Sequence, residues 1–255
     1  MTGWSFRRVV AQTEMFFQSA HQWFDFSLKP SGKLVSFYWY FPGILLERDL
    51  SVTVVDPPLV KHHLTQLRSI DTPAADFRRL VGTLSTLLAC EATKNLLLEE
   101  QSVQTPLCDT LGWRLKQRIG LVPILRAGLG MLESVQNLIP DAEVRHLGFY
   151  RDEETALPVE YYNKLSTSDA CDAALILDPM LATGGSASLA FETLTQWGVH
   201  DIRLLSLVSS PEGIAKLQTK HPTMDIFVCT IDDKLNDRHY IVPGLGDAGD
   251  RIFGT

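Results

Sequence analysis

Apolar runs recur along the chain and alternate with longer segments of helical pattern. Runs of this kind predict strands buried on both faces, the usual state of strands inside a parallel sheet. The runs are 119–125, 173–177, 202–208 and 226–231, and further strands are predicted at 52–55 and 144–150. The predicted helices are 59–68, 77–88, 131–138, 187–196 and 211–220. This alternation predicts right-handed crossovers and an α/β fold around a parallel sheet.

The helix predicted at 77–88 has a clear start and an apolar face. Thr72-Pro73 suits a helix start, because a hydroxyl can cap the first turn and proline fits its first position. Apolar residues then follow at helical spacing, which predicts a face directed at a core or a neighbouring subunit. Arg78 and Arg79 are expected on the solvated face of this helix.

Length and charge restrict the classes of protein that remain. A chain of 255 residues can bury one large core, or one core with an appendage. A net charge of −7 argues against a nucleic-acid-binding surface. No segment approaches the roughly 18 apolar residues of a membrane span, and the nearest one, 37–46, is interrupted by Pro42-Gly43. The N-terminus has neither the apolar core nor the cleavage site of a signal peptide.

The four cysteines, Cys90, Cys108, Cys171 and Cys229, lie far apart and form no C-x-x-C pair. This spacing indicates reduced, mostly buried thiols of a cytoplasmic protein, not a zinc site or a disulfide framework.

A candidate phosphate site follows the strand predicted at 173–177. Backbone N–H groups at the start of the next helix are free to bind an anion, and glycines let the chain approach it closely. Asp178, at the carboxyl end of the strand, has a carboxylate that can accept hydrogen bonds from two adjacent hydroxyls. The simpler alternative is an aspartate that caps a helix, with glycines needed only for the turn. The candidate residues are Asp178, Pro179, Met180, Leu181, Ala182, Thr183, Gly184, Gly185 and Ser186.

This pattern is neither a Walker loop nor a dinucleotide fingerprint, because it lacks Gly-Lys-Ser/Thr and the G-x-G-x-x-G spacing. It resembles the phosphoribosyl-pyrophosphate (PRPP) motif of the type I phosphoribosyltransferases. The string Asp178-Pro179-Met180-Leu181-Ala182-Thr183-Gly184-Gly185-Ser186 is similar, more narrowly, to that of the uracil phosphoribosyltransferases.

A second turn at the same sheet edge follows the strand predicted at 119–125. It carries Arg126, whose forked donors suit pyrophosphate oxygens, and Gly128 and Gly130, which permit close approach of the backbone. The string from Val122 to Met131 resembles the pyrophosphate loop of the same family. The alternative is an ordinary strand-to-helix turn with a surface arginine.

A charged break at 151–155 and Pro158 follow the strand predicted at 144–150 and precede the segment 159–165. Such a run is usually a solvated loop. It resembles the family's mobile loop, in which the arginine, here Arg151, reaches the pyrophosphate. A lid of this kind would exclude water from a reactive glycosyl centre.

The glycine-rich end of the chain, 241–255, suits a loop around a small planar ligand, whereas the alternative is a floppy tail. It resembles the uracil-binding end of the family. The resemblance implies contacts to uracil from Ile241, Gly246, Asp247 and Ala248, with Asp247 also contacting PRPP or its metal-bound water.

The resemblance, taken over 49–255, implies a type I phosphoribosyltransferase fold with a small C-terminal base-binding hood. It implies pyrimidine salvage, in which uracil and PRPP give UMP and pyrophosphate. Thr183 to Ser186 would bind the 5′-phosphate, Asp178 the ribose hydroxyls, and Arg126 and Arg151 the pyrophosphate. Mg²⁺ would be held mainly by PRPP and water, GTP would activate, and the protein would be a cytoplasmic homo-oligomer. The alternatives are a regulatory protein that senses PRPP or UMP, and an enzyme for another base.

Residues 1–48 match no pattern of this family, and aromatic residues crowd them without a helical or alternating period. Three interpretations stay open: an accessory segment, a regulatory extension, or upstream sequence read through because the true start lies later. The last is favoured, because the resemblance begins abruptly near Asp49.

Overall fold

The computed structural model describes residues 26–28, 34–41, 44–48, 52–151, 158–163 and 170–255, and the chain divides into two compact units, Met1–Asp49 and Leu50–Thr255. In the first unit, strands β1 (Phe26–Leu28), β2 (Leu34–Phe41) and β3 (Ile44–Arg48) form an antiparallel sheet. The sequence analysis found no strand period here.

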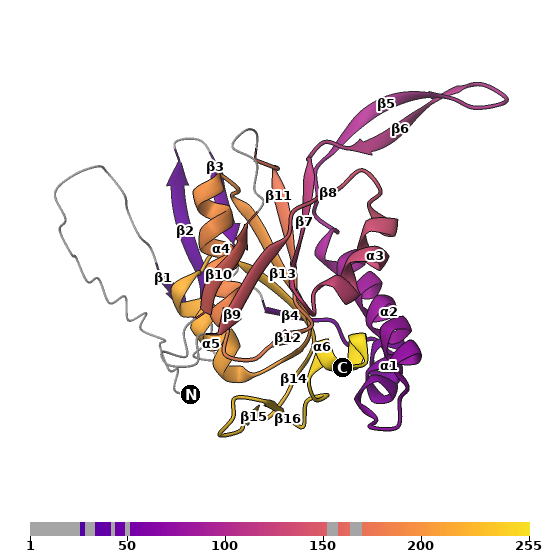
Figure 1. The fold of residues 1–255 in the computed structure, drawn as a ribbon. Coiled ribbons are helices and arrows are strands. Elements are labelled where there is room, and N and C mark those ends of the chain that lie inside the picture. The colour runs from indigo at the N-terminus through magenta and orange to yellow at the C-terminus, as the bar shows by residue number, and fades with distance from the viewer. Residues whose placement is uncertain (1–25, 29–33, 42–43, 49–51, 152–157, 164–169) are drawn as a thin grey trace, which may run out of the picture. The chain divides into compact units, whose positions relative to one another are not determined.

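The second unit is built around one large sheet (Figure 1). Its strands, in spatial order, are β10 (Pro158–Asn163), β9 (Leu147–Arg151), β7 (Ile119–Leu125), β11 (Ala173–Leu177), β13 (Asp201–Ser209), β14 (Asp225–Ile231) and β4 (Val52–Val54). Two short strands, β8 (Glu143–Val144) and β12 (Met180–Leu181), pair with β7 and β13. All neighbours in this sheet are parallel except β9 and β10. The predicted α/β fold with a central parallel sheet is confirmed, with an antiparallel edge added.

The single strand predicted at 144–150 is wrong, because the structure divides it into β8 and β9. Val144 pairs with Leu121 and Leu147 with Ile124, so this register brings His146 level with Pro123. Proline has no N–H to donate, and the ladder is therefore interrupted there.

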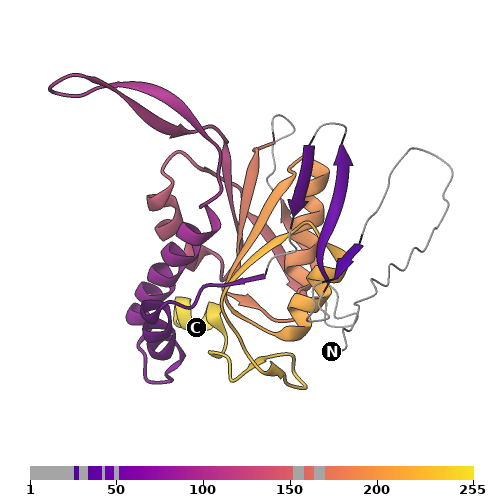
Figure 2. The same ribbon diagram turned by 180° about the vertical axis from the view of Figure 1, so that it is seen from behind.

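Helices cover both faces of the sheet (Figures 1 and 2). One face carries α1 (Pro58–Arg68), α2 (Ala74–Ala92), α3 (Leu129–Leu138) and the short C-terminal α6 (Ala248–Phe253). The other carries α4 (Gly185–Trp197) and α5 (Pro211–Lys220).

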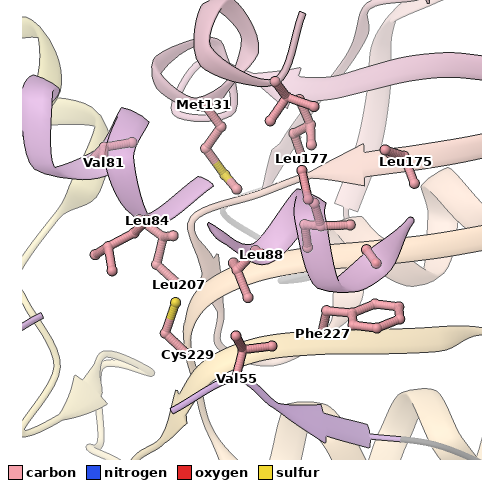
Figure 3. Packing of buried hydrophobic residues seen from close by; sticks show 14 of the residues in the cluster. Val55, Val81, Leu84, Leu88, Met131, Leu175, Leu177, Leu207, Phe227 and Cys229 are labelled. Atoms are coloured by element: carbon pink, nitrogen blue, oxygen red, sulfur yellow. The ribbon is translucent and has the colours of Figure 1, made fainter. Parts of the chain in front are cut away.

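The two-residue period of the strands divides the core between these faces. Leu175 and Leu177 of β11 pack on the α2 side, whereas Ala174 and Ile176 pack on the α4 side. Figure 3 shows the buried residues on the α2 side, with Leu88 of α2 among residues of the sheet. Strands buried on both faces explain why the sequence shows continuous apolar runs instead of alternation.

Two expectations for α2 are wrong in detail. Thr72 does not cap this helix; its hydroxyl donates to the carbonyl of Gln66 at 2.6 Å and closes the turn after α1, while Pro73 stands at the cap without a side-chain bond. Arg78 is not simply solvated, because its Nη1 donates to the carbonyl of Ile252 at 2.8 Å. Arg79 does lie on the exposed face, where it pairs with Asp76.

Two hairpins lie outside the main sheet. The first, β5 (Leu98–Gln104) with β6 (Asp109–Leu115), projects from the unit (Figure 1) and was not predicted from the sequence. The second, β15 (Lys234–Leu235) with β16 (Ile241–Val242), precedes α6. Within the described residues, no helix is long and apolar enough to cross a membrane.

The cysteines only partly follow the prediction of mostly buried thiols. Cys171 and Cys229 are buried, whereas Cys90 and Cys108 are exposed. Cys108 belongs to the turn of the projecting hairpin, where its N–H donates to the hydroxyl of Thr105 at 3.1 Å.

Candidate active site

The two candidate turns meet at the carboxyl edge of the sheet because β7 and β11 are parallel neighbours. Leu177, which precedes Asp178, lies level with Pro123, three residues before Arg126. The contact is close: a Cβ added to Gly128 would lie 2.3 Å from the carbonyl oxygen of Leu177. The strand order therefore places the candidate pyrophosphate loop, which begins at Arg126, directly beside the candidate phosphate site at 178–186, the cradle.

The cradle surrounds a cavity of about 80 Å³. Gly184 stands at the cap of α4 with φ +70°, and no side chain accepts a bond at this cap. The first N–H groups of α4 are therefore available to an anion, and the helix dipole favours negative charge there. The lining residues are Asp178, Met180, Leu181, Ala182, Thr183, Gly184, Gly185, Ser186 and Ala187.

The cradle is supported from behind by the start of α5. Ser210 donates through Oγ to the carbonyl of Ala182 at 2.6 Å and accepts from the N–H of Gly213 at 3.0 Å. A Cβ on Gly213 would lie 2.3 Å from that same carbonyl, so the two segments touch through their backbones. Pro179 does not line the cavity; its carbonyl accepts from the N–H groups of Leu207 and Val208.

Asp178 lies in the wall of the cavity and is only partly exposed. Burial raises the pKa of Asp178 to about 7, and a hydrogen bond from the Met180 N–H at 3.3 Å opposes this rise without cancelling it. Among the described residues, no neighbouring cation lowers the pKa of this carboxyl. It is therefore poised near neutrality to become a charged acceptor for hydroxyl donors.

Arg126 begins the turn after β7 and is about half exposed. Its Nη2 donates to Oδ1 of Asp250 at 2.7 Å, and its guanidinium lies 5.5 Å from the centre of the Phe253 ring. Both partners belong to α6, so the C-terminal helix contacts the pyrophosphate-loop candidate.

The predicted base-binding residues run from β16, which contains Ile241, to the first residue of α6, Ala248. Ile241 and Ala248 are buried, and Gly246 has a positive φ of +82°. Asp247 caps α6, because its Oδ1 accepts from the N–H of Asp250 at 2.9 Å. The backbone of Gly244 is occupied by the turn itself, since an added Cβ would lie 2.1 Å from the carbonyl oxygen of Ile241. Gly246 is less crowded, since an added Cβ would lie 3.7 Å from the Cδ of Arg251, an ordinary contact.

A partly buried ion pair holds this loop, and the sequence analysis missed it. Arg68, the last residue of α1, donates to both oxygens of Asp232 at 2.8 and 2.5 Å. The same two side chains hold Gly244: Asp232 accepts from its N–H at 2.7 Å, and Arg68 donates to its carbonyl at 2.6 Å. Asp232 follows a buried strand directly, as Asp178 does. Its position at the end of a predicted strand was the feature of the sequence that could have identified it.

A second arginine also missed by the sequence analysis adds to this support. Arg251 donates to the carbonyls of Leu245 at 2.8 Å and Ser69 at 2.5 Å, and its guanidinium lies 4.2 Å from the Phe77 ring centre. The predicted base-binding loop from Ile241 to Ala248, the base loop, is therefore tied to α1 and α2 at several points.

The mobile loop predicted after β9 cannot be placed against this site. Arg151 ends β9, and β10 begins at Pro158, but the side chain of Arg151 and residues 152–157 lie outside the described residues.

The described residues offer no cluster of three or more His, Cys, Asp or Glu side chains that could hold a metal ion by itself. A cation bound mainly by the oxygens of a phosphorylated substrate and by water would fit this donor set.

Comparison with known proteins agrees with this geometry. The family model described as uracil phosphoribosyltransferase matches residues 54–255. The uracil phosphoribosyltransferase of Alkaliphilus oremlandii is 53% identical over 205 residues, which cover 80% of this chain and 98% of that protein. That of Roseiflexus castenholzii is 53% identical over 204 residues, with the same coverage of 80% and 98%.

Among solved structures, the AQ2163 protein from Aquifex aeolicus is 37% identical and superposes with a TM-score of 0.76, covering 80% of this chain and 99% of that chain. The predicted resemblance and its phosphoribosyltransferase fold are thereby confirmed. The chain belongs to the uracil phosphoribosyltransferase family.

Proposed function

We propose that this protein transfers the 5-phosphoribosyl group from PRPP to uracil and so forms UMP and pyrophosphate, a reaction of pyrimidine salvage. One observation carries the proposal: the Asp178 cavity, Arg126 and the loop before α6 converge at one sheet edge, in a chain whose residues 54–255 match this family. The pentosyl transfer is assigned to the second unit.

The chemistry asks for positioning and charge stabilisation. Transfer at the anomeric carbon develops positive charge on the ribose ring, so no covalent nucleophile from the protein is required. The protein must orient the sugar, neutralise the departing pyrophosphate and hold the base. A cavity edged by free N–H groups and one carboxylate, with an arginine on the next turn, supplies the first two functions.

The cradle residues Thr183 to Ser186 receive the 5′-phosphate in this proposal, because their backbone surrounds the start of α4. Asp178 accepts from the two ribose hydroxyls. Arg126 binds the pyrophosphate, and Arg151 joins it from the end of β9. Mg²⁺ bound to PRPP would neutralise part of the pyrophosphate charge, with Asp247 accepting from a PRPP hydroxyl or a metal-bound water.

The base is assigned to the loop from Ile241 to Ala248. Main-chain donors and acceptors match the alternating C=O and N–H edge of uracil. From Ile241 to Ala248 the loop carries no cationic side chain of its own, whereas orotate brings a carboxylate that needs one. Cytosine has an amino group where uracil has a carbonyl, which places a donor against a donor.

Pyrophosphate release from PRPP across a panel of bases tests this function. We expect uracil to react at least about ten- to a hundredfold faster than cytosine or orotate, since an unpaired buried polar group costs about 1–3 kcal/mol. Turnover of orotate as fast as uracil would reassign the enzyme to another base. Tight binding of PRPP or UMP without turnover of any base would favour the regulatory alternative.

A pH dependence follows from Asp178. The pKa of Asp178 is about 7 in the folded protein, above the ordinary 3.8. Its ionisation therefore lowers the stability of the fold progressively as the pH rises between these two values, and the full loss is reached above pH 7. The ionised form is the better acceptor for two hydroxyls, so PRPP binding should strengthen as the pH rises. For a pKa near 7, we expect this carboxyl to contribute about tenfold in affinity between pH 6 and pH 8.

The matched variant for that measurement is Asp178→Asn, which keeps the shape and removes the titration. Its affinity for PRPP should be roughly 10- to 150-fold weaker at pH 8, since hydrogen bonds to a charged group are worth about 1.5–3 kcal/mol. PRPP titrates in the same range, so the ratio of the two proteins is the quantity to compare. An equal pH slope in both proteins would remove Asp178 from the binding step.

A homo-oligomer is the assembly proposed here. The β5–β6 hairpin exposes Leu107, Leu111 and Trp113, with 95%, 69% and 64% of their surface accessible. Apolar side chains grouped on a projecting hairpin favour burial against a second copy. A cytoplasmic location, activation by GTP and the dispensability of residues 1–48 for the chemistry stay predictions.

A further inference from the structure

The side chain of Arg126 is held by the C-terminal helix. Asp250 accepts from its Nη2 at 2.7 Å, and the Phe253 ring lies 5.5 Å from its guanidinium carbon. Gly249 leaves the room for this contact, because an added Cβ would lie 3.3 Å from the same Nη2. Helix α6 therefore offers a carboxylate, an aromatic ring and a bare stretch of backbone to one guanidinium.

Asp250 is itself fixed on both sides. Its N–H donates to Oδ1 of Asp247 at 2.9 Å, and its Oδ1 accepts from the hydroxyl of Thr255 at 3.1 Å. Its carbonyl accepts from the N–H of Gly254 at 2.7 Å. Asp250 thus connects Asp247, at the end of the base loop, to Arg126 through one residue.

The helix cannot shift freely against the pyrophosphate loop. Ile252 is buried, and an added Cβ on Gly130 would lie 2.7 Å from its Cδ1. The carbonyl of Ile252 is also bound by Arg78 of α2. The carboxylate of Asp250 is therefore presented to Arg126 from a fixed position.

The pair with Asp250 leaves Arg126 able to bind an anion. A guanidinium has five N–H donors, and within the described residues only one of those of Arg126 has a protein acceptor. Both side chains are about half exposed, at 53% and 51%, so the ion pair adds little to stability. Its effect lies in restricting the orientations of a long, flexible side chain.

We propose that Asp250 is a positioning residue, which orients Arg126 for the pyrophosphate and links this arginine to the base loop. The inference rests on the proposed role of Arg126. It predicts that Asp250 acts through Arg126 and has little effect on transfer when that arginine is absent.

The test is a double-mutant cycle of Asp250→Ala and Arg126→Gln, with kcat and the KM for PRPP measured in pyrophosphate release. We expect Asp250→Ala to lower kcat/KM for PRPP roughly tenfold, because small displacements of a positioning group cost rate steeply. Asp250→Asn should recover most of this loss, since its amide oxygen still accepts from Arg126. In the Arg126→Gln background, Asp250→Ala should cost less than about twofold.

The matched control is Asp76→Ala, which removes an exposed aspartate–arginine pair on α2 and should leave kcat/KM unchanged. An equal tenfold loss with and without Arg126 would overturn the proposal, as would an Asn variant as impaired as the Ala variant. If Arg126→Gln alone leaves PRPP use intact, the proposed role of Arg126 fails first, and the inference fails with it.

Discussion

Replacing Gly128 with alanine is expected to lower transfer activity by about a hundredfold or more while the protein stays folded. The new Cβ would lie 2.3 Å from the carbonyl oxygen of Leu177, and 2.7 Å from both the N and the O of Ile124. These are backbone atoms of two central, paired strands, so the turn has to move instead. Arg126 moves with it, and a displacement of about 1 Å at a positioning group costs on the order of a hundredfold in rate.

The obstacle at Gly128 is space and not conformation, because its φ of −59° and ψ of −22° suit any residue. Overpacking of this kind typically costs about 1–3 kcal/mol, which a domain of ordinary stability survives. Thermal unfolding and kcat/KM for PRPP, measured on the same preparation, separate the two effects. Full activity in this variant would show that the position of the turn does not control transfer.

Gly82→Ala is the matched control for that substitution. The added Cβ also meets an atom at 2.3 Å, but this atom is the hydroxyl oxygen of Ser134, which can rotate away. Gly82 lies inside α2, where alanine is favoured over glycine by about 1 kcal/mol. Activity near the wild-type level is expected, so a loss here comparable to that at Gly128 would point to general disturbance of the fold.

The sequence predicted the parts of the fold that depend on local pattern. The buried strands β7, β11, β13 and β14 follow from apolar runs, and α5 was predicted with its observed bounds, 211–220. Gly198 ends α4 with φ +107°, as a glycine at this position suggests. The candidate site residues Asp178 and Arg126 could be predicted for the same reason, since each follows a predicted strand directly.

Other features depend on which groups meet in the folded chain, and the sequence pattern alone does not show this. The hydroxyl of Thr72 could cap a helix or close a turn, and only the neighbouring carbonyl of Gln66 decides between them. The break between β8 and β9 comes from Pro123 on another strand. Asp250 carries no mark that distinguishes it from Asp247 until α6 brings it to Arg126.

The pair of Arg68 and Asp232 is the most distant of these partnerships, and removing its arginine should have a large effect on base use. In Arg68→Met, the carboxylate of Asp232, which is 3% exposed, loses its cation. Leaving a buried charge without its partner costs about 3–5 kcal/mol, or roughly 6–20 °C in Tm for a unit of this size. The carbonyl of Gly244 also loses its donor.

We expect kcat/KM for uracil to fall on the order of a hundredfold in Arg68→Met, because the base loop is no longer held. PRPP binding, measured by calorimetry, should change little, since among the described residues the α4 cradle is supported by Ser210 of the α5 cap and not by this pair. Arg79→Ala is the control, because it breaks an exposed pair and should alter stability by less than about 1 kcal/mol.

The double variant Arg68→Met with Asp232→Leu separates stability from positioning. Replacing both members of a buried ion pair with apolar residues is often neutral, so Tm should return toward the wild-type value. Uracil use should stay low, because the N–H and the carbonyl of Gly244 lose Asp232 and Arg68 together and the loop has no other bond at this residue among those described. Recovery of both Tm and uracil turnover would mean that the pair serves stability alone; recovery of Tm without turnover would identify it as the support of the base loop.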